Sequence, residues 1–466
     1  MSQVKNVLLI DFGSTYTKLT AVDVESEKIL ATAAAYTTVQ TDINEGLDEG
    51  LKKLREKTGD IKFDSCYACS SAAGGLRMVT SGLVPELTSE AARLASLGAG
   101  AKVVGIYSFE LTEYDLEEIK EQKPDIFLLV GGTDGGNRDC IIHNAKMLAS
   151  MNPEFPIIIA GNRSASATCS KILEGCEVYI CPNVMPKFGV LNIEPTQKKI
   201  REIFLERIIS AKGLSRAAEL LSDIMMPTPS AVLSAMELLS KGTEDELGIG
   251  ELLAVDVGGA TTDIYSIADG MPEHMNTVYK GLPEPYAKRT VEGDIGMRYS
   301  IQGIIDAAGE DKICSLSTLP AERVKEIVSD LKSHTDKVPA GEDDLEKLDF
   351  ALAASAIEEA VSRHAGTISE TYTMMGQTFV QEGKNLTKVK NIVVTGGSLI
   401  HTKRTAEIAS FALYSPSSPA SLRPKKSDVW VDRTYILAAM GLLSVHYPKA
   451  ALRIMKKELE FHGYSE

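Results

Sequence analysis

Two short segments combine acidic, glycine and hydroxyl residues in the same order. Asp11–Lys18 reads Asp-Phe-Gly-Ser-Thr-Tyr-Thr-Lys, and Asp256–Asp263 reads Asp-Val-Gly-Gly-Ala-Thr-Thr-Asp. Each begins where an apolar run, Val7–Asp11 or Leu252–Asp256, ends in Asp. Glycine permits a tight reversal into a following strand, and hydroxyls with backbone N–H groups at its tip suit phosphate oxygens. The terminal Asp is placed to hold Mg²⁺ through water, because Mg²⁺ keeps much of its hydration shell.

Either turn alone could be a plain hairpin between core strands. As a pair, they predict a clamp on a triphosphate, with Mg²⁺ held between Asp11 and Asp256. The predicted nucleotide contacts are Gly13, Ser14, Thr15 and Lys18 in the first turn, and Gly258, Gly259, Thr261 and Thr262 in the second.

A third segment, Val393–Ser398, runs from an apolar strand into Gly396 and Gly397. Glycines there let a flat ring lie against the backbone, and Ser398 could cap a following helix. An ordinary strand-to-helix turn is the alternative. Its place after the second phosphate-type turn favours contact with adenosine.

The surrounding sequence predicts the elements that carry these turns. Short apolar runs alternate with helical or polar stretches, which indicates α/β layering with a mostly parallel sheet. Expected strands are Val7–Asp11, Thr17–Asp23, Lys28–Ala33, Ser65–Ser70, Val103–Ser108, Asp125–Val130, Ile157–Gly161, Val178–Cys181, Leu252–Asp256, Thr261–Ile267 and Asn391–Thr395. Expected helices include Asp42–Thr58, Lys198–Ile209, Ile295–Ala308, Ala321–Ser333, Leu345–Met375, a stretch from Gly397 to about Phe411, Arg433–Ser444 and Ala450–Leu459. Because an Asp-Gly turn opens each half, the simplest organisation is a duplicated protein with lobes at 1–249 and 250–466.

The three turns in this order resemble those of the actin, Hsp70 and sugar kinase ATPase superfamily, over nearly the whole chain. The resemblance implies an α/β fold of two ribonuclease-H-like lobes with ATP in the cleft between them. It also implies that Asp11, Asp256 or Asp263 positions the attacking water. Gly396, Gly397 and Ser398 match the adenosine loop, and the helix after Asp432 resembles a connecting segment.

Further stretches resemble a narrower family, the MutL/GlmL accessory proteins encoded beside adenosylcobalamin-dependent glutamate mutase. These stretches are Ser70–Leu76, Leu129–Gly136, Val291–Gly296 and Asp432–Ala439. The resemblance implies a Mg²⁺-dependent, chaperone-like ATPase that reactivates the mutase by releasing damaged cobalamin. Its expected partners are the subunits of that mutase or of a related aminomutase, and a homodimer is left open.

Two other functions share this fold. A small-molecule kinase would transfer phosphate to a sugar or an acetate-type metabolite. An activator of a radical dehydratase would carry an iron–sulfur cluster, with Cys66 and Cys69 as ligands. Ordinary core thiols are the simpler interpretation of that Cys pair. The Gly131–Gly136 loop precedes an expected helix and could accept an anion, but Asp134 would repel a phosphate, which favours a structural turn or a client-facing loop.

Composition narrows the class of protein. The 466 residues carry 49 Lys plus Arg against 64 Asp plus Glu, a net charge of −15. Such an acidic chain has little attraction for phosphate backbones or anionic lipid, so we expect neither nucleic acid nor membrane as a partner. No apolar run reaches the ~18 residues of a membrane span, and no signal peptide is evident. Seven scattered cysteines favour reduced thiols and a cytoplasmic protein.

Overall fold

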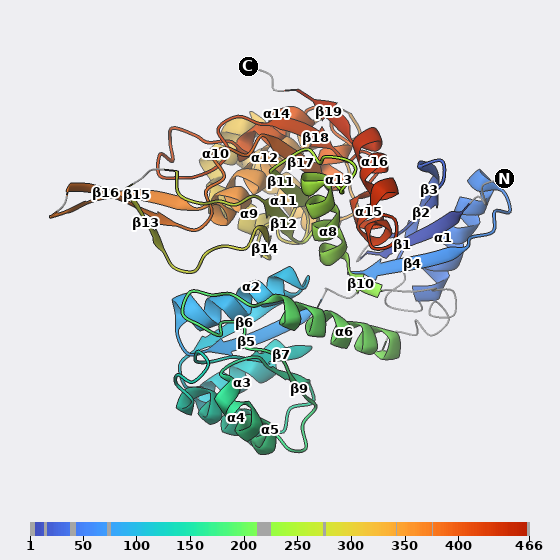
Figure 1. Ribbon diagram of the computed structural model, residues 1–466. Helices are drawn as coiled ribbons and strands as arrows, with labels where there is room; N and C mark the ends of the chain where they lie inside the picture. Colours follow the sequence, from blue (N-terminus) through green and yellow to red (C-terminus); the bar gives the residue numbers. More distant parts are fainter. Residues whose placement is uncertain are drawn as a thin grey trace. The chain divides into compact units, whose positions relative to one another are not determined.

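The computed structural model describes residues 5–13, 16–37, 43–71, 76–211, 225–273, 276–341, 343–374 and 376–463 (Figure 1). The chain forms two compact units. The first holds residues 1–235, 281–283 and 438–454, and the second holds 236–280, 284–437 and 455–466. The chain passes into the second unit within α8 (Thr228–Lys241) and returns to the first for α15 (Leu437–Ser444) and most of α16 (Pro448–Glu458). The division into lobes at 1–249 and 250–466, which the sequence suggested, remains a prediction.

The first unit contains a five-stranded sheet built around a strand that is buried along most of its length. Its order is β10 (Met225–Pro227), β4 (Ser65–Ser70), β1 (Asn6–Phe12), β2 (Tyr16–Asp23) and β3 (Lys28–Tyr36). β2 is antiparallel to its neighbours β1 and β3, whereas β4 and β10 run parallel to β1. The apolar run of β1 suits a central strand covered on both faces. Helix α1 (Ile43–Thr58) packs on β2 and β3, with Leu47 and Leu54 buried.

A second five-stranded sheet, entirely parallel, is inserted in this unit between β4 and β10. Its order is β6 (Lys102–Ser108), β5 (Arg77–Gly82), β7 (Ile126–Leu129), β8 (Ile157–Ile159) and β9 (Val178–Ile180). Helices α2 (Glu90–Gly98) and α6 (Glu194–Ala211) pack in the core on one face, and α3 (Glu113–Gln122), α4 (Asp139–Ser150) and α5 (Arg163–Ile172) in the core on the other. Numbered within the insert, the order is 2-1-3-4-5, a doubly wound arrangement. The predicted parallel sheet is confirmed here.

The sheet of the second unit repeats the arrangement around β1. Its order is β14 (Ala287–Glu292), β12 (Thr262–Ile267), β11 (Leu252–Val257), β17 (Asn391–Thr395), β18 (Asp428–Val431) and β19 (Glu460–His462). β12 is antiparallel to both β11 and β14, and β17 and β18 run parallel to β11. The first five strands thus match β3-β2-β1-β4-β10 in order and direction. Two ribonuclease-H-like sheets, as the resemblance implied, are confirmed.

Four helices pack with the sheet in the core of the second unit. They are α9 (Ile301–Ala308), α10 (Glu310–Ser317), α11 (Ala321–Ser333) and α12 (Asp344–His364). The buried, Ala-rich α12 packs against α9, α10 and β12. Asp343 begins it as an N-cap, its carboxylate accepting the Glu346 N–H at 2.8 Å.

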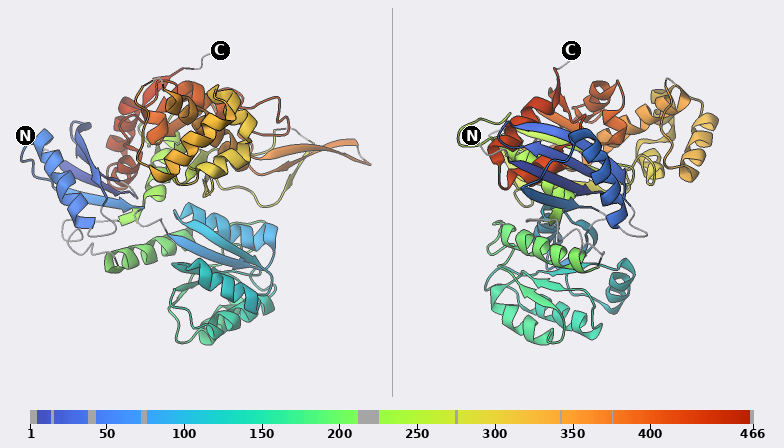
Figure 2. Two further views of the ribbon diagram at one scale, coloured as in Figure 1. Left: turned by 180° about the vertical axis from the view of Figure 1, so that it is seen from behind. Right: turned by 90° about the vertical axis from the view of Figure 1, so that its right-hand side faces the viewer.

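The predicted helix Leu345–Met375 is wrong beyond residue 364. Residues Thr367–Thr373 form β15, which pairs with β16 (Gly376–Glu382) and, through it, with β13 (Thr277–Lys280). The β-branched and aromatic residues in Thr-Ile-Ser-Glu-Thr-Tyr-Thr favour a strand. These strands form an arm that projects from the rest of its unit (Figures 1 and 2).

The helices of the C-terminal part are shorter and more often interrupted than predicted. The helix expected from Gly397 to about Phe411 is three short pieces, α13 (Gly397–Ile400), α14 (Thr405–Ala409) and the 3₁₀ turn Ser410–Ala412. The Thr405 hydroxyl donates to the Leu399 carbonyl at 2.6 Å and holds α13 against α14. The helix expected from Arg433 begins at Leu437, after Tyr435 adopts a left-handed φ of 57°. Among the described helices, none is both long and apolar enough to cross a membrane.

Candidate functional site

The first Asp-Gly turn joins β1 to β2. The Gly13 N–H donates to the Tyr16 carbonyl oxygen at 3.1 Å, closing the reversal between the paired residues Phe12 and Thr17. A Cβ on Gly13 would lie 2.6 Å from that oxygen, so the close approach requires glycine. The predicted contacts Ser14 and Thr15 lie outside the described residues.

Asp11 is held by several groups at the end of β1. Its side chain is nearly buried, and Oδ1 accepts the Thr228 hydroxyl at 2.7 Å and the Cys69 thiol at 3.4 Å. Lys18, directly opposite on β2, places Nζ 4.0 Å from Oδ2. Such partners make a buried carboxylate tolerable. Sequence reasoning missed Thr228: the following Pro229 signals a helix start, but nothing local signals a contact with a residue 217 positions away.

The second turn has the same geometry. The Gly258 N–H donates to the Thr261 carbonyl oxygen at 2.9 Å, and Val257 pairs with Thr262. A Cβ on Gly258 would lie 2.8 Å from that oxygen. Gly259 is exposed at the tip, as a ligand contact requires. Thr262 is fully buried and its hydroxyl donates to the Ile295 carbonyl at 3.1 Å, a contact that does not favour a role in nucleotide binding.

The segment after β14 supports the second turn from behind. The Met297 N–H donates to the Gly258 carbonyl at 3.0 Å, and the Tyr299 N–H to the Gly259 carbonyl at 2.9 Å. The Ser300 hydroxyl donates to the Ala260 carbonyl at 2.7 Å. The helix predicted from Ile295 therefore begins only at Ile301, because the intervening backbone is bonded to the turn.

Charged residues gather on one face of the second unit's sheet. Asp256 lies directly opposite Asp263, and Tyr265 directly opposite Arg289, so the four side chains share a face. The Arg289 guanidinium is almost fully buried and donates to Asp263 Oδ1 through Nε at 2.8 Å, with Nη2 at 2.6 Å from the same oxygen. Burial alone would lower the pKa of Arg289, but the charge of Asp263 raises it overall, so the pair is ionic. Sequence reasoning missed Arg289.

The third segment follows β17. Gly396 has φ 106°, and a Cβ there would lie 2.3 Å from the Val257 carbonyl oxygen, so this turn packs on the end of β11. A Cβ on Gly397 would meet open space. The Ser398 hydroxyl oxygen is buried and has no hydrogen-bond partner among the described residues. Buried hydroxyls are normally paired, so this one favours a ligand or water at the loop.

Asp432 anchors the backbone beside this loop. It is fully buried, and its carboxylate accepts the Ile436 N–H at 2.9 Å and the Leu437 N–H at 3.2 Å. The Thr395 hydroxyl donates to it at 3.4 Å. Asp432 therefore links the end of β17 to the start of α15.

Comparison with known proteins decides the family. The MutL protein family matches residues 7–459. The chain belongs to the MutL family. Protein MutL of Clostridium tetanomorphum is 47% identical over 456 residues, covering 97% of this chain and 98% of the relative. The predicted resemblance to this family is confirmed.

Solved structures give weaker matches to this MutL-family chain. The activator of 2-hydroxyisocaproyl-CoA dehydratase from Clostridium difficile, with bound ADPNP, is 10% identical, with a TM-score of 0.36 and 98% coverage of both chains. Xylulose kinase from Bifidobacterium adolescentis is 11% identical, with a TM-score of 0.36, covering 100% of this chain and 97% of the kinase.

All seven cysteines of the MutL-family chain lie within the described residues and are free thiols. Cys66 and Cys69 are three residues apart on β4, so they point to opposite faces of the sheet. Burial raises the pKa of Cys66 to about 12, and burial with the nearby charge of Asp11 raises that of Cys69 well above its usual value. This geometry favours core thiols over ligands of a shared cluster.

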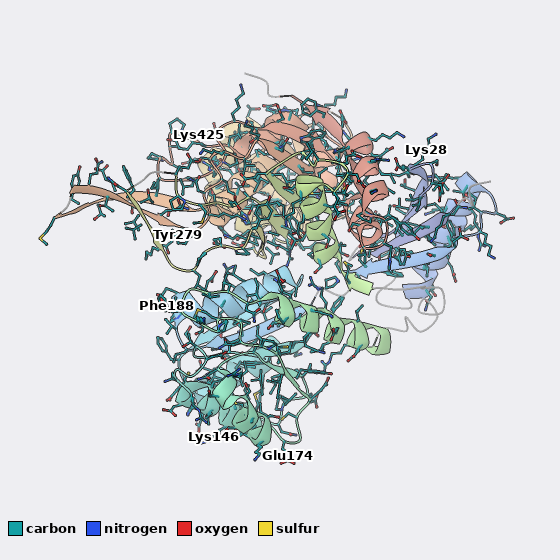
Figure 3. The ribbon with its side chains drawn as sticks, viewed as in Figure 1. Lys28, Lys146, Glu174, Phe188, Tyr279 and Lys425 are labelled. Carbon is teal, nitrogen blue, oxygen red and sulfur yellow. The ribbon has the colours of Figure 1, made fainter. Side chains whose placement is uncertain are left out.

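The Gly131–Gly136 loop is bonded within the protein. Asn162 donates to the Gly136 and Asn137 carbonyls at 3.0 and 2.9 Å and accepts the Gly135 N–H at 3.2 Å. Asn183 donates to the Gly132 carbonyl and to Asp134, each at 3.0 Å. These contacts favour a structural turn. The neighbouring loop after β9, bonded to it through Asp134, presents Phe188 at the surface, 77% exposed (Figure 3).

Proposed function

We propose that this MutL-family protein hydrolyses ATP with Mg²⁺ and serves as a reactivating factor for an adenosylcobalamin-dependent mutase, glutamate mutase or a related aminomutase. The observation that carries the ATPase is the matched pair of turns. In each, an Asp is the second-to-last residue of a central strand, β1 or β11, and a glycine N–H closes the reversal two residues later. Family membership supports the mutase as client.

The residues of both turns fit Mg²⁺ and phosphate. Mg²⁺ takes one or two carboxylates and keeps several waters, so Asp11 and Asp256 suffice as protein ligands. Bound there, Mg²⁺ would screen the negative charge of the phosphates. The hydroxyls of Ser14, Thr15 and Thr261, the backbone N–H groups of the turns and Lys18 would bind phosphate oxygens.

The adenosine is assigned to the loop after β17. Open space beside Gly397 leaves room for a flat ring, and the unpaired Ser398 hydroxyl offers a hydrogen bond. Gly396 brings the loop against the end of β11. This loop and the second turn therefore lie at one end of the sheet.

Asp11, Asp256 and Asp263 are the candidates to orient the attacking water. Asp11 is bonded to Thr228 and Cys69, and Asp263 to Arg289, so the contacts of these carboxylates do not rank one above another. Hydrolysis would then drive release of damaged cobalamin from the client, so that intact cofactor can bind.

The test compares wild type with Asp256→Ala in Mg²⁺-ATP hydrolysis, with and without glutamate mutase inactivated by turnover. We expect the variant to lose hydrolysis and only the wild type to restore mutase activity. Asp306→Ala, at an exposed residue on α9, is the matched control. ATP hydrolysis without reactivation of the mutase would support the proposed nucleotide site and contradict glutamate mutase as the client. Hydrolysis strongly stimulated by one metabolite, with phosphate transferred to it, would indicate a kinase instead.

A further inference from the structure

Three consecutive carbonyl groups at the tip of the second turn, those of residues 258–260, accept hydrogen bonds from one segment of the chain, residues 297–300. The donors are three backbone N–H groups and one hydroxyl, at 2.7 to 3.0 Å: Met297 to Gly258, Arg298 and Tyr299 to Gly259, and Ser300 to Ala260. Three successive peptide units of the turn are therefore fixed by the same segment.

The same bonds orient the N–H groups of the turn. The described chain contains no cis peptide bond, and in a trans peptide unit the C=O and the N–H point in opposite directions. The N–H groups of Gly259, Ala260 and Thr261 therefore point away from residues 297–300, and among the described residues they have no hydrogen-bond acceptor. Gly259 and Ala260 are exposed. Successive backbone N–H groups presented in this way suit an anion.

The Arg298 side chain ties the supporting segment to the rest of its unit. It is 12% exposed, and its guanidinium meets both carboxylate oxygens of Asp349 on α12, Nη1 to Oδ1 at 2.9 Å and Nη2 to Oδ2 at 2.7 Å. Nη1 also donates to the Met297 carbonyl at 2.8 Å, and Nη2 to the Lys337 carbonyl at 3.1 Å. A planar guanidinium can reach these acceptors together, which a lysine ammonium cannot. Arg298 thus joins the segment to α12 and to the connection between α11 and α12.

We infer that Arg298 is a positioning residue for phosphate binding: it anchors residues 297–300, which hold the N–H groups of the second turn ready for an anion. This inference rests on the proposed function. The guanidinium nitrogens are already bonded to Asp349 and to two backbone carbonyls, so Arg298 acts through the backbone of the turn and not by touching phosphate. Donors oriented in advance need no rearrangement when the charged group arrives.

The experiment compares the binding of ATP and of adenosine to the full chain by isothermal titration calorimetry. Adenosine is assigned to the loop after β17, so it reports on the part of the site that Arg298 does not position. Arg298→Gln removes the guanidinium fork, and we expect ATP binding to weaken about tenfold or more while adenosine affinity stays within about twofold of wild type. Arg298→Lys keeps the charge beside Asp349 but loses the fork, so ATP binding should weaken only about threefold.

Ser300→Ala tests the same support without leaving a buried charge unpaired. It removes the hydroxyl that fixes the Ala260 carbonyl, and we expect ATP binding to weaken about threefold with adenosine binding unchanged. Ser317→Ala is the matched control, because it removes a hydroxyl-to-carbonyl bond of the same 2.7 Å length, to Ile313 in α10. Both of its affinities should equal those of the wild type.

A purely structural ion pair predicts a different result. Arg298→Gln would then melt at a lower temperature but bind ATP as the wild type does, and this would overturn the inference. An equal loss of ATP and adenosine affinity would also overturn it, because the effect would not be confined to phosphate. If Arg298→Gln does not fold, unchanged ATP binding by Ser300→Ala overturns it. A wild type that binds no ATP would instead reject the proposed function itself, whatever the variants do.

Discussion

The two Asp-Gly turns have the same backbone geometry and differ in the contacts that surround them. Asp11 is bonded to side chains from two other strands and from the start of α8, through Lys18, Cys69 and Thr228. The second turn is supported through its backbone, by the segment from Met297 to Ser300. The two hairpins thus share the reversal closed by glycine and differ in the contacts that surround it. The first turn should be sensitive to side-chain changes, and the second to changes in backbone.

The largest effect is expected from the acids themselves. Asp11→Asn and Asp256→Asn should each lower ATP hydrolysis about 100-fold or more, because each would remove a negative charge from the proposed Mg²⁺–phosphate site. Steady-state phosphate release measures this, with Asp306→Asn as the unaffected control. If one Asn variant kept wild-type turnover, the turns would not be equivalent in function.

Glycine substitutions test the shared backbone. Gly13→Ala and Gly258→Ala would place a Cβ 2.6 and 2.8 Å from a carbonyl oxygen, so each turn must open. We expect a stability loss of about 1–3 kcal/mol and at least a tenfold loss of hydrolysis. Thermal melting and turnover measure the two effects.

Gly259→Ala is the matched control, since its Cβ would be 3.7 Å from the Tyr299 ring, an ordinary contact. It should retain wild-type stability. A Gly258→Ala protein as stable as Gly259→Ala would contradict the close-approach argument.

Local sequence signals made the two turns predictable, whereas the long-range side-chain contacts were not predicted. An Asp-Gly reversal between apolar runs is visible within ten residues, and both turns formed as expected. Thr228 meets Asp11 from 217 residues away, and Arg289 meets Asp263 from 26 residues away, so neither contact leaves a local pattern. Arg and Thr are also common on protein surfaces, so their presence in a sequence does not indicate a buried contact.

The errors in secondary structure have physical causes. β5 was missed because Arg-Met-Val-Thr-Ser-Gly contains few apolar residues, although the parallel sheet buries nearly all of it. β15 was predicted as a continuation of α12 because the boundary at Ala365–Gly366 carries no proline, although Gly366 is a residue type that often follows the end of a helix. The two ribonuclease-H-like sheets followed from the family resemblance and not from the periodicity, and the strand orders come from the structure alone.

The Thr228→Val variant tests whether the hydroxyl of Thr228 supports the Asp11 carboxylate. It removes the 2.7 Å donor to the buried Asp11 carboxylate while preserving side-chain shape. We expect a stability loss of about 1–3 kcal/mol and a smaller loss of hydrolysis than in Asp11→Asn. Thr228→Ser, which retains the hydroxyl, is the control. Equal behaviour of the Val and Ser variants would show that the hydroxyl does not support Asp11.

The smallest effect is expected at Cys69. A thiol is a weak donor, so Cys69→Ala should lower hydrolysis only about twofold, less than Thr228→Val does.

Because the pKa of Cys69 is raised well above its usual value and that of Cys66 to about 12, both remain thiols at pH 8. Iodoacetamide should therefore leave both unlabelled in the native protein and modify them only after denaturation. Cys176, which is partly exposed, serves as the labelling control, with peptide mass spectrometry as the readout. Rapid native labelling of Cys69 would mean that the thiol is exposed as thiolate, and that it does not act as a hydrogen-bond donor to Asp11.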